Sequence, residues 1–256
     1  MNDESRSIEL EIEVPGTPEE VWRAIATGPG ITSWYVPHSV EEREGGAASA
    51  RFGSGPEMEI PGRVAAWEPP HRIVFDGGEG VGGLAFEWLV EARDSGTCIV
   101  RLVNSGFGNG DEWDDQYDAM TEGWKMFLVN LRLHLTHFGG KSATASIPGA
   151  VWPGSGDAAW AKLCGKLGLA VGPTVGDRVD LAPADGLERG GIIADVAPAR
   201  VTLLLDSPAP GVGLIAAETM GDVVQVSVWS YLYGAQAEAV IAADESLWQE
   251  WLDALA

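Results

Sequence analysis

Residues 122–135 read EGWKMFLVNLRLHL and form the most regular stretch of the chain. Their apolar side chains recur at steps of three and four, which is the spacing of one face of an α-helix. The same spacing reaches back to Trp113 and on to Phe138. We therefore predict one long amphipathic helix of about 27 residues, whose apolar face packs against another layer of the fold.

The sequence before this helix predicts an antiparallel sheet. Residues 8–14 alternate apolar and acidic side chains, as a strand with one solvent-exposed face does. Thr17, Pro18 and Glu20 then carry the signature of a helix start with a capping box. Further strand candidates follow without helical sequence between them, which favours antiparallel pairing. These candidates span residues 39–43, 47–52, 58–67, 72–76, 84–92 and 97–104.

The second half of the chain repeats the pattern of the first half in a weaker form. The stretch GRVAAWEP at residues 62–69 aligns with GIIADVAP at residues 191–198, and an arginine and a β-branched strand follow both. The closing helix of the second half is shorter, at residues 245–255. We predict two tandem domains, residues 1–140 and 141–256, with the second a degenerate copy of the first. The alternative is a chance similarity between two antiparallel sheets. Residues 139–156 are expected to form a linker, either without regular structure or with one short strand.

The charge of the chain excludes several classes of partner. Asp and Glu number 38 against 16 Lys and Arg, which gives a net charge of −22. Such an acidic surface repels phosphate, so we expect no nucleic-acid or membrane partner. Cys98 and Cys164 form no disulfide framework and indicate a reducing compartment. The polar start of the chain and the absence of a long apolar stretch predict a cytoplasmic location.

No catalytic motif stands out in the sequence. It has no P-loop, no dinucleotide-binding glycine pattern after a strand, no HExxH and no nucleophile elbow. His134 and His137 lie at a spacing that brings two imidazoles together for a metal, but no third ligand stands at a useful distance. An interaction with the helix dipole explains them better. We therefore predict no cofactor, no metal and no catalytic residue.

Several motifs in order resemble one superfamily. They are TPEEVWRAI at 17–25, ITSWYVP at 31–37, GRVAAWEPPHRIVF at 62–75, DSGTCIVRLVNSGFG at 94–108 and EGWKMFLVNLRLHL at 122–135. Together they are similar to the SRPBCC (START-like) superfamily, in the branch named after the activator of the heat-shock protein 90 ATPase. This resemblance covers residues 6–138. It implies an α+β helix-grip fold, in which a curved antiparallel sheet wraps a long C-terminal helix and leaves a cavity between them. Many members bind apolar small molecules there, and some catalyse cyclisation or related reactions.

The residues of this expected cavity follow from the resemblance and from strand periodicity. Superfamily pockets lie under the N-terminal part of the long helix, and Phe86 and Trp88 share one strand face, as do Met58 and Ile60. Arg101 either points outward as a solvated charge or points inward and pairs with Glu59 or Glu87. The predicted ligand-binding residues are Trp34, Tyr35, His38, Met58, Phe86, Trp88, Arg101, Trp113, Tyr117, Met120 and Trp124.

These features favour a non-enzymatic protein that binds a small apolar or aromatic molecule, as a monomer or homodimer. One alternative is an enzyme of the same fold, of the cyclase, dehydratase or hydrolase type. It needs an inward acid–base pair, such as His38 with Glu59 or Arg101 with Glu87. The other alternative is a stress-response module that binds a protein partner and is related to chaperone ATPase activators.

Overall fold

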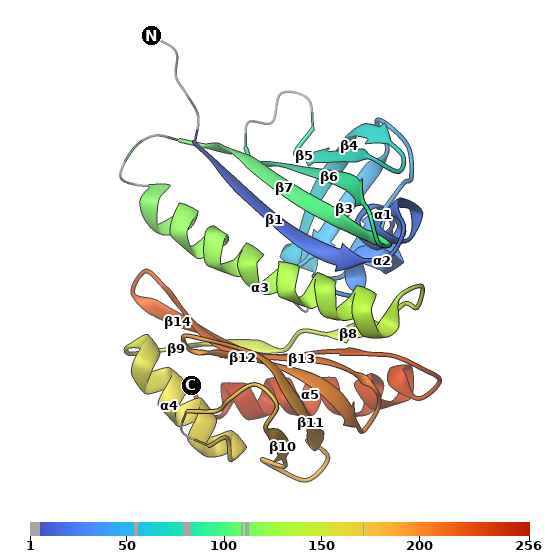
Figure 1. Ribbon diagram of the computed structural model, residues 1–256. Helices are drawn as coiled ribbons and strands as arrows, with labels where there is room; N and C mark the ends of the chain where they lie inside the picture. Colours follow the sequence, from blue (N-terminus) through green and yellow to red (C-terminus); the bar gives the residue numbers. More distant parts are fainter. Residues whose placement is uncertain (1–5, 54–55, 79–82, 109, 111–112, 171) are drawn as a thin grey trace. The chain divides into compact units, whose positions relative to one another are not determined.

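The computed structural model describes residues 6–53, 56–78, 83–108, 110, 113–170 and 172–256. The chain divides into two compact units, Met1–Ser142 and Ala143–Ala256 (Figure 1). Each unit combines an antiparallel sheet with helices, which confirms the predicted α+β class. Among the residues that the structure describes, no helix has the length and apolar character needed to cross a membrane.

The first unit is built as the sequence predicts, from one sheet and one long closing helix. The sheet has seven strands in the order β1-β7-β6-β5-β4-β3-β2, and every neighbouring pair is antiparallel. The elements are β1 (Arg6–Pro15), α1 (Pro18–Ala26), α2 (Gly28–Thr32), β2 (His38–Val40), β3 (Ala47–Arg51), a 3₁₀ turn (Pro56–Met58), β4 (Glu59–Glu68), β5 (Arg72–Asp76), β6 (Ala85–Arg93), β7 (Thr97–Phe107) and α3 (Asp114–Phe138).

Local sequence signals set the helix ends of this unit. Thr17 caps α1 as predicted, because its hydroxyl accepts from the Glu20 amide at 3.3 Å while the Glu20 carboxylate accepts from the Thr17 amide at 2.8 Å. The helix α3 ends at Phe138, as its apolar spacing indicated, and is 25 residues long. Figure 1 shows α3 lying across one face of the sheet. We call this face of the sheet the inner face.

The two faces of the first sheet differ in chemistry. The inner face carries the rings that meet α3, while the outer face carries ion pairs between neighbouring strands. The Arg63 Nε lies 2.9 Å from the Asp76 Oδ1, and the Arg72 Nε lies 2.5 Å from the Glu87 Oε1. Side chains alternate between the two faces along a strand. The residues directly before and after these charged ones therefore point to the inner face.

The second unit repeats this architecture in reduced form, as expected for a degenerate copy. Its sheet has the order β10-β11-β12-β13-β14-β8, and β9 also pairs with β14. The elements are β8 (Thr144–Ser146), β9 (Gly149–Trp152), α4 (Gly156–Leu167), β10 (Arg178–Leu181), β11 (Arg189–Ala197), β12 (Arg200–Ser207), β13 (Gly211–Met220), β14 (Val223–Leu232) and α5 (Ala237–Asp253). The closing helix α5 has 17 residues against the 25 of α3.

Two details of the second unit differ from the sequence prediction. The linker segment, expected to hold no more than one short strand, contains two, β8 and β9, because both pair with the edge of β14. The helix α5 begins at Ala237 rather than at Glu245. Its first turns were missed because Asp244, a charged residue, lies on the buried face and interrupts the apolar pattern.

Candidate functional site

Aromatic rings from four parts of the first unit meet between α3 and the inner face. We call the seven rings in contact with one another the aromatic cluster. The Tyr35 ring lies at its centre, with its centroid 4.4 Å from that of Phe127 and 5.0 Å from that of Trp124. The members of the aromatic cluster are Trp34, Tyr35, Phe52, Phe86, Trp88, Trp124 and Phe127.

Hydrogen bonds fix the indole rings of this cluster. The Trp124 Nε1 donates to the Asn104 Oδ1 at 3.2 Å, and the Asn104 Nδ2 donates in turn to the Ala85 carbonyl at 3.1 Å. The Trp34 Nε1 donates to the Ala24 carbonyl at 2.9 Å. The polar tips of these two indoles are therefore satisfied inside the protein, so the cluster presents rigid apolar faces.

One side of the aromatic cluster is open. Trp34, Trp88 and Trp124 are only 1%, 4% and 5% exposed, whereas Tyr35 and Phe86 are half-buried. Strand register shows what continues the surface on the open side. On adjacent strands, Ala50 pairs with both His38 and Ile60. Ala48 pairs with Gly62. The Phe52 amide donates to the Met58 carbonyl at 3.0 Å. We call these residues the inner wall: His38, Ala48, Ala50, Phe52, Met58, Ile60 and Gly62.

The inner wall is apolar and accessible. Phe52, Met58 and Ile60 are 37%, 37% and 57% exposed, and no other described residue of the first unit is a large hydrophobic residue with comparable exposure. Small residues, Ala48 and Ala50, lie between the large ones on the adjacent strands. Exposed apolar residues that gather on one face of a unit are typical of a binding surface.

The titratable groups beside the inner wall are held uncharged. Burial lowers the pKa of His38 to about 4, against the opposing effect of its hydrogen bond with Val36. The His38 Nδ1 lies 2.8 Å from the Val36 carbonyl oxygen, so Nδ1 carries the proton of the neutral ring and Nε2 is an acceptor. Burial also raises the pKa of Tyr35 above its ordinary value, so its phenol stays protonated.

Three predicted site residues lie nearer the start of α3. Trp113 and Tyr117 contact Phe107, with ring centroids 6.3 Å and 5.2 Å away. The Tyr117 hydroxyl donates to the Ser7 carbonyl at 3.0 Å, and the Arg6 guanidinium lies 4.2 Å from the Tyr117 ring centroid. This second group of rings fastens the start of α3 to β1 and β7. Met120 is half-buried, one turn before Trp124.

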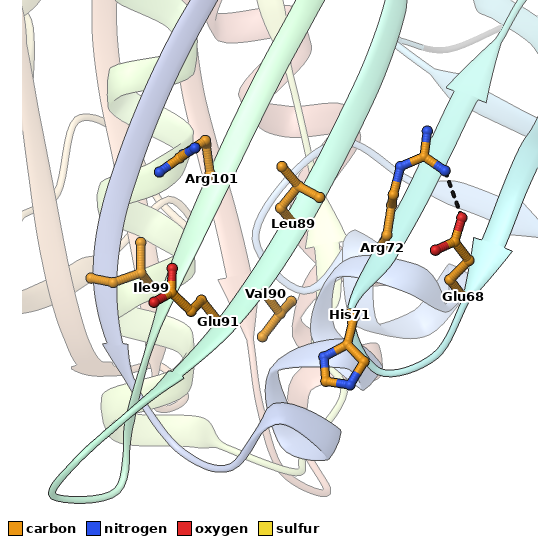
Figure 2. Close-up of a pocket in the computed structure, with 8 residues that line it drawn as sticks. All are labelled: Glu68, His71, Arg72, Leu89, Val90, Glu91, Ile99 and Arg101. Carbon is orange, nitrogen blue, oxygen red and sulfur yellow. Dashed lines mark hydrogen bonds and ion pairs between the residues drawn. The ribbon is translucent and has the colours of Figure 1, made fainter.

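Arg101 lies on the outer face, which corrects its assignment to the cavity. Its neighbours Val100 and Leu102 are fully buried on the inner face, so Arg101 must point the other way. Its Nη2 lies 3.5 Å from the Glu11 Oε2. Arg101 lies beside Leu89 (Figure 2), and both residues line a shallow outer hollow of about 370 Å³.

The two carboxylates expected to pair with His38 or Arg101 inside the cavity, Glu59 and Glu87, lie on the outer face as well. Glu87 binds Arg72 on the outer face, and Glu59 is exposed opposite Arg51. His134 is 2% exposed whereas His137 is exposed, so the two do not face one ion. Among the described residues, no group of three or more His, Cys, Asp or Glu could hold a metal.

The sequence prediction missed some residues of this site. Phe127 is not among the predicted ligand-binding residues, yet its ring lies against that of Tyr35. Phe52 and Ala50 had not been singled out, although the spacing of Ala48, Ala50 and Phe52 at alternate positions marks one strand face. This alternation in the sequence is the signal from which that strand face could have been predicted.

Replacing Asn104 with Ala should destabilise the protein by about 2–5 kcal/mol. The change leaves the Trp124 indole N–H and the Ala85 carbonyl without their partner and opens a small cavity. Urea denaturation measures the effect. Arg101→Ala on the exposed face of the same strand is the matched control and should change stability by about 0.5 kcal/mol or less. Equal stability of the two variants would contradict this account of the cluster.

Acid should destabilise the first unit through its buried histidines. Burial lowers the pKa of both His38 and His134 to about 4 in the folded chain, from an ordinary 6.5. Above pH 6.5 neither state binds the proton, so there is no effect. As the pH falls from 6.5 to 4 only the unfolded chain is protonated, and stability is lost by about 1–3 kcal/mol per histidine.

Urea denaturation at pH 7 and pH 4.5 tests this expectation. His134→Gln should lose less stability on acidification than the unchanged protein does. His137→Gln, one turn away at an exposed position of α3, is the control and should keep the full acid response. An unchanged acid response in His134→Gln would show that His134 does not contribute.

The model of the family described as "Activator of Hsp90 ATPase homolog 1-like protein" matches residues 15–136. No curated protein sequence matches the chain.

Solved structures also match. Protein BH1534 of Bacillus halodurans is 22% identical, with 51% of this chain and 96% of that chain covered and a TM-score of 0.45. The Aha1 dimer of Colwellia psychrerythraea is 19% identical, with 51% and 96% covered and a TM-score of 0.43. The di-domain ARO/CYC BexL from the BE-7585A biosynthetic pathway is 16% identical, with 97% and 92% covered and a TM-score of 0.45.

Proposed function

Because the first unit belongs to the Aha1-like family of the SRPBCC superfamily, we propose that it is a non-enzymatic binding protein for a small apolar or aromatic molecule. The molecule would lie between α3 and the inner wall. One observation carries the proposal: the exposed large hydrophobic residues of the unit, Phe52, Met58 and Ile60, share one wall beside rigid aromatic rings. A ligand that covers them removes apolar surface from water, which is the main source of affinity in such sites.

The chemistry of the wall favours an uncharged aromatic ligand. Every residue of the inner wall is apolar except His38, which is neutral at pH 7 because burial lowers its pKa to about 4. The half-buried rings of Tyr35 and Phe86 offer faces and edges for aromatic contact. The His38 Nε2 is a hydrogen-bond acceptor, which suits a hydroxyl group on the ring of the ligand.

An enzymatic role has less support. An enzyme of this fold would need an acid–base pair that points into the cavity, either His38 with Glu59 or Arg101 with Glu87. Glu59 is exposed on the other face of β4, and Arg101 and Glu87 both lie on the outer face. The groups beside the wall are thus two neutral side chains, Tyr35 and His38, without a carboxylate from either expected pair to move a proton between them.

A protein-binding role is the remaining alternative. The two roles differ in which residues of the inner wall the bound molecule would cover. A protein partner would cover the rim of the wall, at Met58 and Ile60. A small molecule would fill the space above Ala50, which lies between His38 and Ile60 on adjacent strands. Bulk added at Ala50 therefore acts directly on a small ligand.

Ala50→Trp should abolish or weaken binding of a small aromatic probe, neutral 2-naphthol, followed by titration calorimetry. The added indole fills the space above β3, and we expect the affinity to fall by about tenfold or more. Ala47→Trp is the matched control, because Ala47 is exposed on the outer face of the same strand. It should bind the probe as the unchanged protein does.

Two results would overturn the proposal. One is the absence of saturable 2-naphthol binding by the unchanged protein. The other is equal affinity of the Ala50→Trp and Ala47→Trp variants, which would place the probe elsewhere. Thermal unfolding of both variants establishes that they are folded, and Ala48→Trp on the same wall replaces Ala50→Trp if that variant unfolds.

A further inference from the structure

The interior of the second unit holds a buried ion pair. The Arg189 Nη1 lies 2.8 Å from the Asp244 Oδ2, and the two residues are only 3% and 4% exposed. Arg189 begins β11 and Asp244 lies on the inward face of α5. The Arg189 Nε also donates to the Ser230 hydroxyl at 3.1 Å, and its Nη1 donates to the Glu188 carbonyl at 2.9 Å.

Small residues flank Ser230, the residue that the Arg189 side chain reaches. On the sheet, Gly213 pairs with Ser230, and Ser230 pairs with Ser146 on β8. Directly paired residues of antiparallel strands point to the same face, so these three share the sheet face on which the Arg189 side chain reaches Ser230. The helix α5 packs against β8, β9 and β14, and its buried residues include Trp248, one turn after Asp244. The Arg189 guanidinium lies 5.5 Å from the Trp248 ring centroid.

Four buried polar atoms of this part of the second unit have no hydrogen-bond partner among the residues that the structure describes. They are the Arg189 Nη2, the Asp244 Oδ1, the Ser146 Oγ and the Trp248 Nε1. A buried polar group without a partner costs about 1–3 kcal/mol, and a charged group costs more. Native proteins contain few such atoms, so four around one buried ion pair indicate that water or another molecule satisfies them.

The atoms specify what that partner is. Three of them donate: a guanidinium N–H, an indole N–H and a hydroxyl. The fourth, a carboxylate oxygen, only accepts. The charges of Arg189 and Asp244 balance one another, so a charged molecule would leave one charge unpaired in the interior.

We propose that the interior of the second unit is a binding site for a small neutral molecule that carries a carboxamide or hydroxyl group. The oxygen of that group accepts hydrogen bonds from Arg189 and Trp248, and its N–H or O–H donates to Asp244. Ser146 completes the site from β8. This site is separate from the inner wall of the first unit and does not rest on the function proposed for it.

The indole N–H of Trp248 provides a direct probe of the site. In a ¹H–¹⁵N spectrum of the full chain, assigned with Trp248→Phe, we expect acetamide to shift this resonance saturably. Acetone has a similar size and accepts hydrogen bonds but cannot donate to Asp244, so it should not reproduce the shift. The partly buried Trp160, whose indole lies outside the group of unpaired atoms, is an internal control and should not respond.

A paired substitution tests the residues without leaving a lone buried charge. Arg189→Met combined with Asp244→Leu replaces the ion pair with apolar side chains of similar volume, a change that proteins often tolerate. This double variant should remain folded and lose the acetamide response. Ser146→Ala removes one donor without changing charge and should weaken the response if the double variant does not fold.

The outcomes separate a ligand site from simple hydration. A Trp248 resonance that does not respond to acetamide would show that water alone satisfies these atoms, and the proposal would be wrong. Equal responses to acetamide and acetone, or an undiminished response in the folded double variant, would also overturn it. A saturable, acetamide-specific shift that the substitutions remove would establish the site.

Discussion

The burial of the Trp124 indole is the constraint on which the first unit depends. An indole N–H taken out of water needs an acceptor, and the acceptor here is Asn104, which is itself fully buried. Asn104 is fixed in turn by the Ala85 carbonyl, so a chain of two hydrogen bonds ties α3 to β7 and β6. The other rings of the aromatic cluster then pack around an indole whose position is set. The open side of the cluster, and with it the inner wall, follows from that arrangement.

Much of the fold could be read from local pattern, because local patterns reflect local physics. The capping box at Thr17 and the end of α3 at Phe138 depend on residues within one turn of each other. The contact between Tyr35 and Phe127 depends on where the whole chain brings two distant segments, and no periodicity contains that information. Arg101 shows the same limit in a strand. Alternation places it opposite Val100 and Leu102, but only the assembled sheet shows which face α3 covers.

The two units use one architecture with different interiors. In the first unit the closing helix presents aromatic side chains to the sheet, and the polar groups among them are neutral amides and indoles. In the second unit the shorter helix presents Asp244 to Arg189. The same charged residue that supplies this contact also broke the apolar pattern in the sequence, which is why the start of α5 was missed. A departure from regular pattern thus marked the most unusual part of the interior.

The arrangement of three indoles in the aromatic cluster has an optical consequence. The rings of Trp34 and Trp124 each lie 5.5 Å from that of Trp88, at interplanar angles of 80° and 79°. Electronic transitions of chromophores held so close and so far from parallel couple to one another, and the coupled states absorb left- and right-handed circularly polarised light unequally. This coupling is strongest for the intense far-ultraviolet transition of indole, so we expect these rings to add to the far-ultraviolet circular dichroism of the backbone and to report the integrity of the cluster without any added label.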